Sequence, residues 1–129
     1  MKSQAQGWLN SAADDLLVVE EIIKNDQLTH MVAFHSEQAI EKCFKALFEE
    51  NELSVPRVHD LMMLHSRVER YITLDIDMEL LKQISELYID ARYPSDLGLL
   101  PEGKPPSEVA EQMYELAKKI HQSIRKMGA

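Results

Sequence analysis

The length and composition of the chain favour one globular domain that covers residues 1–129. The chain carries 14 lysines and arginines against 22 aspartates and glutamates, a net charge of −8 at pH 7. Because an acidic surface repels phosphate backbones, we expect no strong non-specific binding of nucleic acid. One cysteine excludes an intramolecular disulfide, and no apolar run approaches the roughly 20 residues that span a bilayer. We therefore expect a cytoplasmic protein without membrane association.

The first predicted element is a helix over residues 4–26, in which Ser3 and Gln6 have the spacing of a capping box. Apolar residues recur every three or four positions and form one stripe: Trp8, Ala12, Leu16, Val19 and Ile23. Charged residues, Asp15 among them, are expected on the opposite, polar face.

The second predicted helix, residues 29–51, is apolar over a wide arc and should be central and buried on most sides. A narrow polar stripe runs along it: His35, Gln38, Lys42, Lys45 and Glu49. The stripe is either a solvated face, with lysine stems lying along apolar surface, or the floor of a groove where a lysine meets a phosphate.

Three further helices follow a connector that contains Pro56, which disfavours helix for itself and the residue before it. The third helix can begin at Asp60 or His59 and the fourth at Asp75 or Asp77. Ser107 is suited to begin the fifth. The third helix should end near residue 71, and Pro94 should end the fourth. Residues 97–106 read as a loop. We therefore predict an all-α fold, an up-and-down helical bundle of about five helices, in which the second and fourth helices are neighbours.

A second polar pattern lies at the end of the fourth helix, where Tyr88 and Arg92 share a face and Tyr93 and Pro94 follow. Arg92 is either a structural anchor between helix and loop, or a bidentate phosphate contact framed by aromatic rings. In the second interpretation Lys42 or Lys45 should lie near the Tyr88–Arg92 face.

The remaining motifs predict no catalytic residue, metal site or cofactor. The His59-Asp60 dipeptide alone is more simply explained by a helix cap than by a metal site. Cys43 lies among apolar residues and reads as an inert core thiol. The chain also lacks Glu-x-x-His, His-Glu-x-x-His, Walker A and Gly-x-Gly-x-x-Gly patterns.

Taken together, segments 34–48 and 88–96, with Trp8 and the His59-Asp60-Leu61 run, resemble the HEPN domain family over most of the chain. The resemblance implies a small helical protein that binds a nucleotide and is often encoded beside a minimal nucleotidyltransferase. It also implies a homodimer, and we expect a symmetric one because the second helix is apolar over such a wide arc.

The chain departs from the many HEPN proteins that are ribonucleases. Their motif, an arginine followed after four to six residues by a histidine, is absent: no histidine follows Arg92 in range, and His121 precedes Arg125. The chain thus resembles a non-ribonuclease branch. We expect a nucleotide- or phosphate-binding module that acts with a nucleotidyltransferase. The alternatives are a protein–protein interaction module without a small ligand, or an atypical ribonuclease toxin.

The site residues expected for the binding module lie on the second helix and at the end of the fourth: His35, Gln38, Lys42, Lys45, Tyr88, Arg92 and Tyr93.

Overall fold

The computed structural model describes the backbone of residues 1–91 and 104–128 and the side chains of residues 1–87 and 104–128. These residues form α-helices and one short 3-10 helix, with no strand in the part described. The elements in chain order are α1 (Ser3–Ile22), η1 (Asp26–Leu28), α2 (Thr29–Glu50), α3 (Leu61–Val68), α4 (Met78–Ala91) and α5 (Ser107–Met127). The predicted all-α helical bundle is confirmed.

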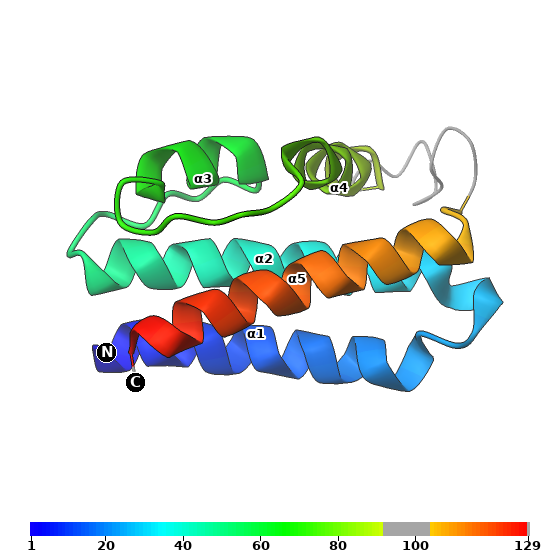
Figure 1. Cartoon of the computed structure of the whole chain (residues 1–129), viewed down its shortest axis with the longest axis horizontal. Coiled ribbons are helices and arrows are strands. Elements are labelled where there is room, and N and C mark those ends of the chain that lie inside the picture. Colours follow the sequence, from blue (N-terminus) through cyan, green and yellow to red (C-terminus); the bar gives the residue numbers. More distant parts are fainter. Residues whose placement is uncertain (92–103, 129) are drawn as a thin grey trace.

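Three long helices, α1, α2 and α5, run side by side along the molecule (Figure 1). Helix α2 returns antiparallel to α1, and α5 runs in the same direction as α2, so both ends of the chain lie at one end of the bundle. The shorter α3 and α4 lie across α2 from α1, and α4 crosses the long helices steeply. Helices α2 and α4 are in contact, as predicted.

Helix α2 is the centre of the core because α1, α3, α4 and α5 all contact it. Its residues Ile40, Phe44 and Leu47 are fully buried, which places a wide apolar arc against four neighbouring helices. That arc is covered within a single chain. The apolar arc of α2 is therefore no argument for the expected homodimer.

The helix starts agree in part with the predicted caps. Asp60 accepts hydrogen bonds from the backbone N–H groups of Met62 and Met63 and caps α3, and Asp77 accepts one from Leu80 at the start of α4. These three hydrogen bonds satisfy backbone donors that the first turn of each helix leaves open.

The caps predicted at Ser3 and Ser107 are wrong. Helix α1 begins at Ser3 itself, after Lys2, and no side chain caps it. Ser107 is the first residue of α5, and its hydroxyl donates to Asp26 on η1 instead. That contact joins two segments that are 81 positions apart in the sequence.

Two predicted helices are also shorter than the sequence pattern suggested. Helix α1 ends at Ile22 because the chain turns into η1, where the Asn25 side chain accepts from the backbone of Gln27. Helix α3 ends at Val68, three residues before the predicted position 71. Among the described helices, none has both the length and the apolar character needed to cross a membrane.

Candidate functional site

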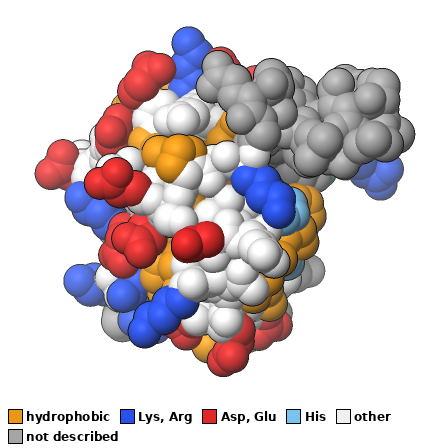
Figure 2. All heavy atoms as spheres, turned by 90° about the vertical axis from the view of Figure 1, so that its right-hand side faces the viewer, with side chains coloured by type: hydrophobic (Ala, Val, Ile, Leu, Met, Phe, Trp, Pro, Cys, Tyr) orange, Lys and Arg blue, Asp and Glu red, His pale blue; other side chains and the backbone are white. Residues whose placement is uncertain are grey.

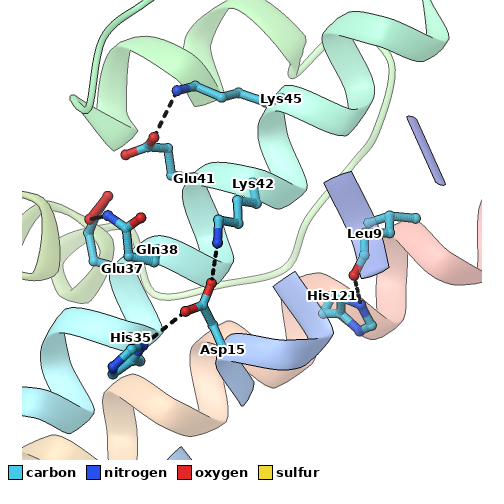
Figure 3. A network of polar contacts seen from close by, with 9 residues as sticks. All are labelled: Leu9, Asp15, His35, Glu37, Gln38, Glu41, Lys42, Lys45 and His121. Atoms are coloured by element: carbon cyan, nitrogen blue, oxygen red, sulfur yellow. Dashed lines mark hydrogen bonds and ion pairs between the residues drawn. The ribbon is translucent and has the colours of Figure 1, made fainter. Parts of the chain in front are cut away.

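The polar stripe predicted on α2 divides into two networks that face different neighbours (Figure 3). His35 and Lys42 point toward Asp15 of α1, whereas Lys45 pairs with Glu41 on the side that faces the connector, residues 51–60. The solvated-face interpretation is wrong for Lys45, which is only 7% exposed.

The first network, the Asp15 cluster, joins α1 to α2 through one carboxylate. His35 Nδ1 lies 2.9 Å from Asp15 Oδ1, and Lys42 Nζ donates to Oδ2 over 2.7 Å. Asp15 is buried, so its predicted place on the polar outer face of the first helix is wrong. Because two donors on α2 satisfy both of its oxygens, the burial of this charge is compensated.

The second network, the Glu41 cluster, links α2 to the connector. Lys45 Nζ donates to Glu41 Oε2 over 2.8 Å, and His59 Nδ1 lies 2.8 Å from Oε1. The pair of Lys45 and Glu41 is almost fully buried, while the side chain of His59 is 35% exposed. Because Glu41 accepts at both oxygens, it fixes the positions of two groups that come from different elements.

Glu37 lies one helical turn before Glu41 and is fully buried. Burial, and after it the hydrogen bond and charge of Glu41, raise the pKa of Glu37 to about 10, so its carboxyl is neutral at pH 7. Burial also acts to raise the pKa of Glu41. Hydrogen bonds from Glu37, Lys45 and His59 outweigh that effect, and the net shift of the Glu41 pKa is downward. The pair therefore holds one proton and one negative charge.

A pocket of about 430 Å³ opens beside the Glu41 cluster. It is lined by one residue of α1, one of α2 and four of the connector: Trp8, Lys45, Val55, Pro56, Arg57 and His59. We call it the connector pocket. The Lys45 ammonium lies 5.7 Å from the centroid of the Trp8 ring, within reach of a cation–π contact.

The connector pocket is locally cationic in an acidic chain. With Glu37 neutral, the Lys45 and Glu41 charges balance, and the exposed Arg57 adds one positive charge. His59 adds a further charge when it is protonated. Anions are therefore favoured here, although the whole chain has a net charge of −8.

A larger hollow, of about 840 Å³, lies between the start of α4 and α5, and its charge has the opposite sign. Five carboxylates line it, Asp75, Asp77, Glu108, Glu111 and Glu115, with Lys119 as the one cation among its lining residues. Such a surface disfavours a phosphate ligand. The end of the molecule where α1 turns into α2 shows acidic and basic side chains interspersed over the described surface (Figure 2).

The structure brings together only some of the predicted site residues. Lys45 lines the connector pocket, whereas His35 and Lys42 belong to the Asp15 cluster. Gln38 donates to Glu37 over 3.1 Å. Tyr88 lies within α4, but its side chain falls outside the described residues, as do Arg92 and Tyr93. The predicted approach of a lysine to the Tyr88–Arg92 face stays a prediction.

Sequence reasoning overlooked the two buried glutamates and Arg57. Glu37, Glu41 and Lys45 are spaced four apart, which places them along one side of α2. Two acids in one row with a lysine on a largely apolar helix were the sequence signal for a buried polar cluster. Arg57 had none, because it lies on a connector without periodicity.

Two other predictions concern Cys43 and His59. Cys43 is fully buried, and this burial, with the charge of Asp15, raises the pKa of its thiol, as expected of an inert core cysteine. Asp60 acts as a helix cap, and His59 binds Glu41. In the part of the chain that the structure describes, no three His, Cys, Asp or Glu side chains are placed to hold a metal ion.

The comparison with known protein families agrees with the family resemblance noted in the sequence. Neither the curated proteins nor the solved structures include a match to this chain. The family model described as HEPN domain matches residues 5–127, which is nearly the whole chain and includes every helix from α2 to α5 in full. The chain therefore belongs to the HEPN domain family.

Proposed function

We propose that this HEPN domain binds a small phosphate-bearing ligand, a nucleotide in the first instance, in the connector pocket. The observation that carries the proposal is the convergence of Lys45, Arg57 and His59 beside the ring of Trp8. These side chains come from three parts of the chain and meet at one opening.

The chemistry of each lining residue suits such a ligand. A pocket of about 430 Å³ lies in the usual range for small-molecule sites. Arg57 carries a planar donor fork that matches phosphate oxygens, and Lys45 is a point charge that Glu41 holds in place. The half-buried Trp8 ring offers an apolar face on which a base can stack.

The partners expected from the family are part of the same proposal. A separately encoded minimal nucleotidyltransferase would be the protein with which this module acts, and a homodimer would be its working form. An interaction module without a small ligand is the second candidate. It is favoured by two apolar side chains on α1, Leu17 and Val18, which are 58% and 40% exposed.

Calorimetric titration of the purified protein with AMP at pH 7.5 tests the proposal. Trp8 is the one tryptophan of the chain, so its fluorescence reports directly on the connector pocket. We expect weak binding that declines with added salt, accompanied by a change in Trp8 emission.

Arg57→Ala should weaken binding by on the order of 1–3 kcal/mol, the range for hydrogen bonds to charged groups. Arg67→Ala is the matched control, because Arg67 is also an exposed arginine but lies on α3 and does not line the pocket. Equal loss of affinity in both variants, or binding that leaves Trp8 emission unchanged, would exclude the connector pocket as the site.

A further inference from the structure

The connector pocket contains a cation whose charge is already balanced within the protein. Lys45 Nζ donates to Glu41 Oε2 over 2.8 Å, and the two side chains are only 8% and 7% exposed (Figure 3). Salt screens such a buried pair much less than it screens a pair on the surface. The ammonium has three donors, so Lys45 can still give a hydrogen bond to a ligand, but Glu41 cancels most of its positive charge.

Glu37 does not disturb this balance. It lies one helical turn before Glu41 and is fully buried, and its Oε1 has no hydrogen-bond donor among the described residues. An ionised Glu37 would leave that oxygen uncompensated, so the carboxyl stays protonated and neutral. The buried row on α2 therefore consists of one neutral acid, one anion and one cation, and its net charge is zero.

Arg57 supplies a positive charge that no such pair balances. It is exposed on the connector and forms no ion pair with any residue of the described part of the chain. Its planar fork can hold two oxygens of one phosphate group. The ring of Trp8 lines the same pocket and offers a face for a base. One fork and one ring match a ligand that carries a base and a single phosphate group.

We infer that Glu41 determines which nucleotides the connector pocket accepts: by balancing Lys45, it makes the pocket selective for nucleoside monophosphates over di- and triphosphates. This inference rests on the proposed function. Glu41 acts through Lys45 and need not touch the ligand. Each further phosphate group adds negative charge that the balanced pair does not offset and that an acidic chain, with its net charge of −8, repels. The pocket volume of about 430 Å³ also lies near the lower end of the range for small-molecule sites.

The test is calorimetric titration of the protein with AMP and with ATP at pH 7.5 and constant ionic strength. Mg²⁺ is left out, because it would neutralise part of the charge of ATP. The measured quantity is the selectivity ratio, the Kd for ATP divided by the Kd for AMP. For the wild type we expect a ratio above one.

Glu41→Gln should lower the selectivity ratio on the order of tenfold, because Lys45 then offers an unbalanced charge to the additional phosphate groups. Glutamine keeps the size of the side chain and an oxygen that can accept from Lys45. Combining Glu41→Gln with Lys45→Gln removes both charges, so the ratio should return to the wild-type value even where both affinities fall. A purely structural role of Glu41 predicts no such return.

Glu111→Gln is the control variant. It removes the same single negative charge, but Glu111 lies on α5 and lines the larger hollow instead of the connector pocket. The selectivity ratio of this variant should equal that of the wild type.

The outcomes separate this inference from the proposed function. A wild-type protein that binds ATP more tightly than AMP would refute the selectivity and leave nucleotide binding intact. An unchanged ratio in Glu41→Gln, or an equal fall in Glu111→Gln, would refute the role of Glu41. If Glu41→Gln does not fold, Lys45→Gln gives the converse test: Glu41 is then unbalanced, so the ratio should rise, and a constant ratio refutes the inference. If the wild type binds neither nucleotide, both proposals fail.

Discussion

Replacing Glu37 by glutamine should change the stability of the protein relative to the wild type in a pH-dependent way. The difference should shift in favour of the variant as the pH rises. Glu37 is fully buried on α2, and burial together with Glu41 raises its pKa from an ordinary value of 4.5 to about 10. Between these two values the native protein keeps a proton that the unfolded chain has lost. The stability that this group contributes is therefore fully present below pH 4.5 and declines up to about pH 10.

The size of the effect follows from the width of that window. The free energy of unfolding should fall by 2.303RT per pH unit because of this one group, or by roughly 3 kcal/mol from pH 6 to pH 8. Glutamine has the shape of the protonated carboxyl and can also donate to Glu41, but has no proton to lose. The difference in stability between Glu37→Gln and the wild type should therefore grow by that amount over this range.

Urea denaturation followed by circular dichroism at pH 6, 7 and 8 measures this difference. The five histidines are present in both proteins, so their contribution cancels in the comparison. Glu49→Gln, a matched change at a half-buried position on the same helix, controls for the loss of any one carboxylate. A stability difference that stays constant or shrinks from pH 6 to pH 8 would show that Glu37 is ionised in the native protein.

Three further predictions address the cap, the thiol and the predicted arginine contact. Asp60→Ala should lower the free energy of unfolding by about 1 kcal/mol in thermal or urea denaturation, because the N–H groups of Met62 and Met63 lose their acceptor. Cys43 should react with a thiol reagent such as DTNB only as fast as the protein unfolds; rapid labelling of the native protein would contradict its burial. Arg92→Lys should weaken AMP binding by on the order of 1–3 kcal/mol if its guanidinium contacts the phosphate, and unchanged calorimetric affinity would confine the site to the connector pocket.

The helices could be predicted from the sequence because periodicity reports how each segment meets the core. The wide apolar arc around Phe44 indicated a central helix, and α2 does contact four others. Helix ends were less predictable. Asp60 is a cap, but the Ser107 hydroxyl bonds Asp26 instead, and a contact between residues so far apart in the sequence leaves no local signal.

The site was harder to predict because it depends on partners from other elements. At about 100° per residue, Lys42 lies roughly 20° around α2 from His35, but Lys45 lies roughly 80° away. A stripe defined by spacings of three and four therefore joined residues that face different neighbours. Asp15 looked like a solvent-facing acid, since its two partners lie 20 and 27 positions later.

The buried acids of α2 are better explained by a role at the connector pocket than by stability. A buried ion pair such as Lys45 and Glu41 seldom stabilises a fold more than apolar residues of the same volume would. Part of the stability that Glu37 contributes is already lost at neutral pH, by the linkage worked out above. A helix that already buries Ile40, Phe44 and Leu47 does not need these charges to fold. What they achieve is to hold one lysine and one histidine, from separate elements, at the wall of a single opening. Groups with strongly shifted pKa values concentrate at functional sites for this reason, and the cluster is where a ligand should be sought first.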